Sequence, residues 1–163
     1  STDWKTSEGQ DRYRRGIYTT WRQSNPYPSM VAFDAPNREV CTVRRSRTNT
    51  PLQSLVTLND PVYVEAAQSL ARRALQHEGT LSEQIAHAFR CCVARPPTEI
   101  ELKVIRQLYE DAKAHLAEQE DDAMKLATDP LGALPAGMSA IDAAAMTVVG
   151  NVLLNLDEMF LKR

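Results

Sequence analysis

The residues best suited to chemistry in this sequence are a group of basic, hydroxyl and amide side chains between positions 44 and 50. The group consists of Arg44, Arg45, Arg47, Thr48, Asn49 and Thr50. Thr50 is a good helix N-cap, and Pro51 suits the first position of a helix because proline lacks an N–H that would be unpaired there. A helix N-terminus offers free backbone N–H groups, and arginine binds phosphate, sulfate or carboxylate through paired hydrogen bonds. The stretch is therefore a candidate site for a small anion or an acidic polysaccharide, with Arg38 as an additional contact.

The same arginines can instead be internal struts. An irregular segment has few backbone hydrogen bonds of its own, and an arginine supplies five donors to carboxylates and carbonyls. The carboxylates considered as partners are Asp34, Glu39, Asp60, Asp157 and Glu158. Residues 1–50 contain nine Lys/Arg against five Asp/Glu, and residues 51–163 contain ten against sixteen, so the basic part can meet an outside anion or the acidic part of its own chain. The sequence favours the internal carboxylates.

Two further pairs have helical i, i+4 spacing. Asn151 and Asn155 lie on one face of a very apolar segment, and buried amides need hydrogen-bond partners. We expect them to contact the segment 48–59, with a ligand-facing role as the alternative. His87 and Cys91 could share a metal ion, but no third and fourth ligand is evident, so we predict no metal site.

Composition restricts the class of protein. The chain has 163 residues, is 43% hydrophobic and 25% charged, and carries a formal net charge of −2, as expected of an ordinary globular domain. No apolar run of about 18 residues predicts a membrane span. The net acidic charge and the lack of a recognition helix or an aromatic stacking set argue against nucleic acid as a partner. We predict no cofactor and no catalytic residue, because no nucleophile elbow, phosphate loop or metalloprotease motif is present. Three cysteines, Cys41, Cys91 and Cys92, leave the disulfide state open.

Apolar periodicity and capping residues predict an all-α fold, an irregular helical bundle of five or six helices with an arginine-rich irregular N-terminal segment. Helices are expected over 11–24, from 51 to about 59, over 61–78, 81–94 and 99–119, and from 140 onwards. The last helix is apolar on nearly all sides and should be central. We expect one domain over residues 1–163, in which 1–10 are flexible and 120–138 form a mobile loop, first acidic and then rich in Gly and Pro.

Several stretches, taken together, resemble a known family. They are DRYRRGIYTTWRQSNPYPSMVAFDAPNREVCTVRRSRTNTPLQSLVTLNDPVYVEAAQSLARR, FRCCVARPPTEIEL and VVGNVLLNLDE. They are similar to the C-terminal part of the planctomycete-specific domain of unknown function, which is found in large exported bacterial proteins that often have cytochrome c-like N-terminal domains. The resemblance implies an exported protein of the periplasm or cell envelope, and a chain that is a fragment, a short paralogue or one partner of a split protein. It supplies no catalytic residue.

These patterns lead to a ranked expectation of function. The first is a non-catalytic helical structural or interaction module of a larger exported protein, whose partner is the rest of the parent protein or another subunit. The alternative is a domain that binds or modifies an anionic ligand through the arginine-rich segment. A second alternative, implied only by the resemblance, is a partner domain of a cytochrome c-like redox protein. The sequence leans away from an enzyme without deciding the matter.

Overall fold

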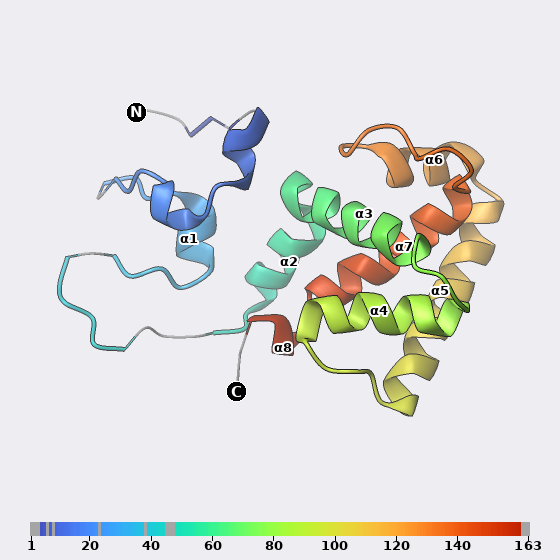
Figure 1. The fold of residues 1–163 in the computed structure, drawn as a ribbon. Helices are drawn as coiled ribbons and strands as arrows, with labels where there is room; N and C mark the ends of the chain where they lie inside the picture. Colours follow the sequence, from blue (N-terminus) through green and yellow to red (C-terminus); the bar gives the residue numbers. More distant parts are fainter. Residues whose placement is uncertain are drawn as a thin grey trace. The chain divides into compact units, whose positions relative to one another are not determined.

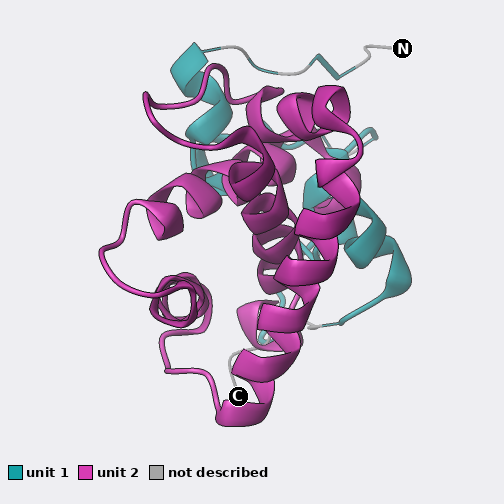
Figure 2. Cartoon of the chain, turned by 90° about the vertical axis from the view of Figure 1, so that its right-hand side faces the viewer, with its two compact units in different colours: residues 1–56 teal, residues 57–163 magenta. Residues whose placement is uncertain are grey.

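The computed structural model describes the chain except for residues 1–3, 6, 8, 23, 38, 45–47 and 161–163. Its contacts divide it into two compact units, residues 1–56 and residues 57–163, with the boundary inside one helix (Figure 2). The prediction of one domain over residues 1–163 stays a prediction. Residues 1–3, 6 and 8, part of the segment expected to be flexible, lie outside the described residues.

The described residues form helices and no strands, which confirms the all-α prediction (Figure 1). Among them, six helices are long, and the other helical elements are short. None of the described helices is both long and apolar enough to cross a membrane.

The first unit contains short helical elements and the start of α2. They are the 3-10 helices η1 (Gly9–Tyr13) and η2 (Gly16–Tyr18), then α1 (Pro28–Ala32) and α2 (Pro51–Asn59). The continuous helix expected over residues 11–24 is therefore wrong. Gly16 lies inside that range and disfavours a helix by about 1 kcal/mol. The apolar side chains expected along one face of this helix are also not buried, since Tyr13 and Ile17 are 64% and 79% exposed. Burial of such a face supplies most of the stability of a helix in a protein.

The second unit is a bundle around α7. Its helices are α3 (Pro61–Leu75), α4 (Leu81–Val93), α5 (Glu99–Ala117), α6 (Glu120–Thr128), α7 (Ala140–Leu154) and the short α8 (Asp157–Phe160). As predicted, α7 is central: it packs against α3, α5 and α6 and also contacts α4 (Figure 1). Small residues allow a close crossing with α3, since a Cβ on Gly150 would lie 2.9 Å from the backbone oxygen of Ala67. The buried face of α7 includes Ala143, Ala144, Ala145, Met146, Val149 and Leu153.

The helix starts were predicted correctly where capping is local. Asp60 accepts a hydrogen bond from the backbone N–H of Val62 at 2.9 Å and caps α3. Thr80 and Thr98 begin α4 and α5 with reciprocal capping boxes that involve Glu83 and Glu101. Each box satisfies backbone N–H groups that a helix start would otherwise leave unpaired.

The segment 120–138 differs from the expected loop, because residues 120–128 form α6. Three acidic side chains in its first turn interact favourably with the positive end of the helix dipole. Ala123 and Ala127 are buried, and α6 packs against α7 and α5. The helix ends before Pro130, and a residue that precedes proline is disfavoured in the helical conformation.

The remaining part of this segment is tied to α3 by two side chains one helical turn apart. Gln68 is 1% exposed, and its amide nitrogen donates to the carbonyl oxygens of residues 126 and 129, both at 2.7 Å. Its amide oxygen accepts from the N–H of residue 131 at 3.1 Å. Arg72 donates to the carbonyl oxygens of residues 127, 132 and 133. The loop before α7 is therefore held through its backbone, which the local sequence did not indicate.

Candidate functional site

The arginine-rich stretch predicted as an anion site is described only in part. Arg45 and Arg47, and the additional contact Arg38, lie outside the described residues. Arg44, Thr48 and Asn49 are exposed, and Thr50 is half-buried. The prediction that these residues bind an anion therefore stays a prediction, but the groups around Thr48 are described in detail.

An internal carboxylate lies at Thr48. The backbone N–H of Thr48 donates to Asp34 Oδ2 at 2.7 Å, and its hydroxyl lies 3.0 Å from Oδ1 and 2.8 Å from Oδ2 of the same residue. The amide nitrogen of Gln53 donates to the carbonyl oxygen of Ala32 at 2.8 Å and to Thr48 Oγ1 at 3.1 Å. Asp34, Thr48 and Gln53 thus join the end of α1 to the start of α2. Asp34, one of the carboxylates considered as partners of the arginines, accepts hydrogen bonds here from the backbone and the hydroxyl of Thr48.

The first turn of α2 is capped in the way the sequence predicted. The N–H of Gln53 donates to Thr50 Oγ1 at 3.3 Å, and the N–H of Thr50 donates to Gln53 Oε1 at 3.0 Å. The backbone N–H groups of Thr50 and Gln53 at this helix start are therefore hydrogen-bonded within the chain. Gln53, which is only 5% exposed, accepts one of these hydrogen bonds with its side chain and donates the other from its backbone.

Of the two asparagines on α7, one makes the expected contact. Thr57, which is 1% exposed, donates from its hydroxyl to Asn155 Oδ1 at 3.0 Å. This confirms the expected contact of Asn155 with the segment 48–59. Asn151 is half-buried, and its side-chain oxygen has no hydrogen-bond partner among the described residues.

His87 and Cys91 are close, as their spacing predicted. The Sγ of Cys91 lies 3.7 Å from His87 Nε2. The imidazole of His77 stacks on that of His87, with ring centroids 4.4 Å apart. Burial and neighbouring basic side chains, among them Arg73 and Arg90, lower the pKa of His87. Within the described part of the chain, no group of three or more His, Cys, Asp or Glu side chains is arranged to hold a metal ion.

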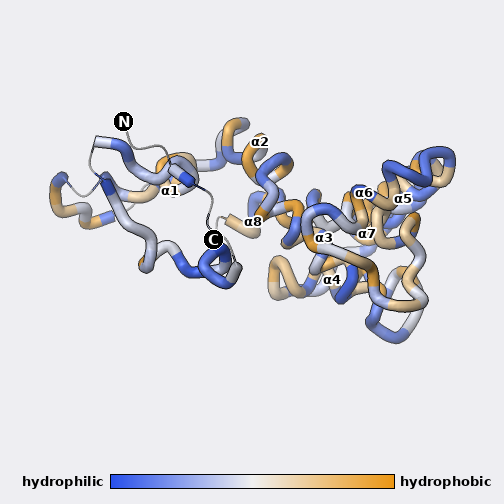
Figure 3. Tube along the Cα trace, turned by 90° about the horizontal axis from the view of Figure 1, so that it is seen from above, coloured by the Kyte–Doolittle hydropathy of each residue, from blue (hydrophilic) through white to orange (hydrophobic). Residues whose placement is uncertain are grey.

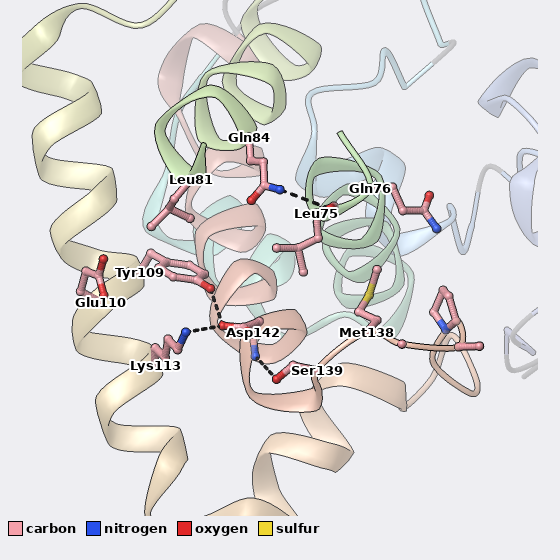
Figure 4. Close-up of a pocket in the computed structure, with 13 residues that line it drawn as sticks. Leu75, Gln76, Leu81, Gln84, Tyr109, Glu110, Lys113, Met138, Ser139 and Asp142 are labelled. Carbon is pink, nitrogen blue, oxygen red and sulfur yellow. Dashed lines mark hydrogen bonds and ion pairs between the residues drawn. The ribbon is translucent and has the colours of Figure 1, made fainter. Parts of the chain in front are cut away.

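The second unit also contains a pocket of about 540 Å³ that the sequence did not predict (Figure 4). It lies between the C-terminal end of α3, the first turns of α4, the middle of α5, and the start of α7 with the loop before it. Apolar side chains from three of these regions form its walls, namely Leu75, Leu81, Pro135 and Met138. The volume is in the range of sites that bind small organic molecules.

Three polar side chains meet at one side of this pocket. Tyr109 and Lys113 of α5 point to Asp142 on α7 (Figure 4). The Tyr109 hydroxyl donates to Asp142 Oδ1 at 2.7 Å, and Lys113 Nζ lies 2.7 Å from the same oxygen. Ser139, the N-cap of α7, accepts from the backbone N–H of Asp142 at 3.3 Å. This cluster braces α5 against the first turn of α7.

The electrostatics of the cluster follow from these contacts. Burial alone would raise the pKa of Asp142, but the hydrogen bonds from Lys113 and Tyr109 outweigh it and leave this pKa lowered. Burial, and then the hydrogen bond to Asp142, raise the pKa of the Tyr109 phenol. The hydrogen bond to Asp142 also raises the pKa of Lys113. At neutral pH the cluster therefore consists of a carboxylate, an ammonium group and a neutral phenol.

The sequence contained one signal for this cluster. Tyr109 stands in the apolar face of α5, and a buried tyrosine hydroxyl needs a hydrogen-bond partner. Periodicity does not reveal the partner, because Asp142 is 33 residues away.

Residues 1–109 match the family described as Protein of unknown function (DUF1553). The chain belongs to this family. The DUF1553 match includes the Asp34–Thr48–Gln53 cluster and ends at Tyr109, so Lys113 and Asp142 of the pocket lie beyond the matched residues. No curated protein and no solved structure matches the chain.

Proposed function

We propose that the chain is a non-catalytic helical module that supports structure and contacts in a larger exported protein of the cell envelope. Its partner is the rest of its parent protein or another subunit. Membership of DUF1553 places the chain in a family of unknown function. The larger parent protein and its export come from the resemblance described in the sequence. A planctomycete source and a link to a cytochrome c-like domain come from the same resemblance.

The observation that carries the proposal is the carboxylate of Asp34 at Thr48. It accepts both the backbone N–H and the hydroxyl of Thr48, so an external anion would have to displace a group that belongs to the chain. Hydrogen bonds from an N–H to a carboxylate are roughly twice as strong as those between neutral groups. This favours a structural role for the charged segment that precedes α2.

The interaction side of the proposal rests on exposed leucines of α2. Leu52, Leu55 and Leu58 are 60%, 58% and 41% exposed, and a spacing of three residues places them on one side of the helix. Figure 3 shows the hydrophobic positions along α2. An exposed row of large apolar side chains is a surface suited to another polypeptide, and we assign it to contact with the parent protein.

An anion titration separates this module from an anion-binding domain. The melting temperature would be followed with phosphate, sulfate and an acidic oligosaccharide at up to about 5 mM, at constant ionic strength, because higher concentrations of phosphate or sulfate stabilise proteins nonspecifically. The proposal predicts no saturable rise for the wild type. A rise that follows RT ln(1 + [L]/Kd) and disappears in Arg44→Ala would overturn it in favour of the anion-binding alternative.

The contact surface has its own test. Sedimentation velocity would compare the chain, mixed with the purified remainder of its parent protein, with the variant Leu52→Ser/Leu55→Ser. The matched control is Ile100→Ser/Val104→Ser, which removes two side chains of α5 that are 77% and 63% exposed. We expect association to weaken at least tenfold in the first variant only. Equal association of all three proteins would contradict the role of α2.

A further inference from the structure

The pocket beside Asp142 contains two side-chain oxygens that receive no hydrogen bond from the described residues. Asp142 receives both Tyr109 and Lys113 on Oδ1, and no described residue donates to its Oδ2. Gln84 uses its amide nitrogen for the carbonyl oxygens of residues 75 and 77 at the end of α3, at 3.3 and 3.1 Å. Its Oε1 receives no hydrogen bond from the described residues. The two oxygens are therefore available to a ligand that donates hydrogen bonds.

The charges that line the pocket favour a positively charged ligand. Glu110 and Asp142 are acidic and Lys113 is the basic residue among the lining side chains, which leaves one net negative charge. The charge of Lys113 is compensated by Asp142 at 2.7 Å. Among the described residues, the ion pair of Glu110 is distant and exposed, with its Oε1 3.9 Å from Arg106 Nε, and its charge also contributes to the raised pKa of Lys113. Its carboxylate can thus turn to a cation at little cost, because exposed pairs of this kind contribute almost nothing to stability.

The apolar walls of the pocket are suited to an aliphatic stem. Leu75, Leu81 and Met138 are half-buried, and each packs against the hydrophobic core while it also lines the cavity. Burial of apolar surface there favours binding. A ligand with one charged head and a short hydrocarbon stem would use the acidic groups and the apolar walls of the pocket at once.

We propose that this pocket binds an organic cation that has a primary ammonium or guanidinium head on an aliphatic stem. The head donates to Asp142 Oδ2 and is attracted by the carboxylate of Glu110, and the stem lies against Leu75, Leu81 and Met138. The inference goes beyond the proposed module function and does not depend on it. Such a group can come from a free amine or from a lysine or arginine side chain of a protein.

The test is a titration of the full chain by two-dimensional NMR with n-pentylamine at pH 7 and constant ionic strength. We expect saturable shifts of the backbone amides of residues 84, 110 and 138. The neutral analogue 1-pentanol has the same stem and should bind at least tenfold more weakly. If 1-pentanol binds as tightly as the amine, the pocket recognises only the stem and the proposal is overturned.

Two variants of α5 test the role of charge with a matched control. Lys113→Gln removes the positive charge inside the pocket and should tighten binding of the amine by about three- to tenfold, as expected for a unit charge a few ångströms away at intermediate dielectric. Lys103→Gln makes the same change of net charge on an exposed position of α5 that does not line the pocket. It should leave Kd unchanged within about twofold. Equal effects of the two substitutions would show general electrostatic attraction and would overturn the site.

Glu110→Gln is an independent variant at an exposed position, so folding should be preserved. It should weaken binding of the amine by about three- to tenfold. An unchanged Kd would contradict the assigned head position.

Two peptides then identify the source of the cation, acetyl-Ala-Lys-Ala-amide and its glutamine counterpart. Tighter binding of the lysine peptide than of pentylamine assigns the pocket to a protein side chain, and the reverse order assigns it to a free amine; either order supports the proposal.

Discussion

Replacement of Tyr109 by phenylalanine should lower the free energy of unfolding, because the substitution removes one hydrogen bond and little else. The hydroxyl donates to Asp142 Oδ1 at 2.7 Å, and the residue is only 4% exposed. A hydrogen bond to a charged group contributes about 1.5–3 kcal/mol. Asp142 keeps the ammonium group of Lys113, and its side chain is 32% exposed, so water can replace part of the lost bond. We therefore expect a loss of about 1–2 kcal/mol.

The assay is urea denaturation of four proteins that form a double-mutant cycle: wild type, Tyr109→Phe, Asp142→Asn and the double variant. The coupling energy between the two sites should be about 1 kcal/mol. Tyr18→Phe is the control, since Tyr18 is 63% exposed, and this substitution should change the free energy of unfolding by less than about 0.5 kcal/mol.

The pH dependence of the coupling gives a further check. Although burial opposes it, the hydrogen bonds from Lys113 and Tyr109 leave the pKa of Asp142 lowered in the folded chain. A lowered carboxyl pKa contributes stability that is complete above the pKa of the unfolded chain, near about 4, and is lost as the pH falls through the folded value. The coupling should be constant from about pH 5 to pH 8 and decrease below about pH 4. A coupling near zero at pH 7, or one unchanged in acid, would refute the brace between α5 and α7.

Three further predictions concern other parts of the second unit. Ala94 ends α4 in the left-handed conformation, at φ 58°, so Ala94→Gly should raise the free energy of unfolding by about 0.5–1 kcal/mol in urea denaturation; a decrease would contradict this. A Cβ at Gly150 would lie 2.9 Å from the backbone oxygen of Ala67. Gly150→Val should therefore lower the denaturation midpoint, at a cost of about 2 kcal/mol or more, and an unchanged midpoint would disprove the close crossing of α3 and α7. The hydrogen bonds from Arg95 lower the pKa of Glu101 to about 2, so NMR titration should find its folded pKa near that value and Arg95→Gln should raise it. The stability that Glu101 contributes is complete above about pH 4.5 and is lost towards lower pH; a titration of Glu101 that Arg95→Gln leaves unchanged would speak against this pair.

The predictions that held depend on short-range chemistry. Asp60, Thr80 and Thr98 cap helices because each side chain reaches backbone groups two or three residues further along. The local sequence contains both partners, so the start of each helix could be predicted. The central position of α7 could also be predicted, since a helix that is apolar on nearly all sides has to be surrounded by others.

The predictions that failed or were missing depend on contacts between distant residues. The expected helix over 11–24 required an apolar core for Ile17, which the first unit does not provide. The loop before α7 is held by Gln68, whose partners are about sixty residues away. The pocket brings Tyr109 and Asp142 together from two helices. The spacing of residues within a single helix does not reveal contacts between distant parts of the chain.

A carboxylate of the chain itself, Asp34, binds Thr48 between the arginine-rich segment and the start of α2. Amide hydrogen exchange at Thr48 measures this directly, because an N–H that is hydrogen-bonded to Asp34 at 2.7 Å should exchange slowly. We predict that the Thr48 amide is protected in the wild type without any added anion and that Asp34→Ala removes this protection. A Thr48 amide that exchanges freely in the wild type and becomes protected only when phosphate is added would show that an external anion, and not Asp34, binds this amide.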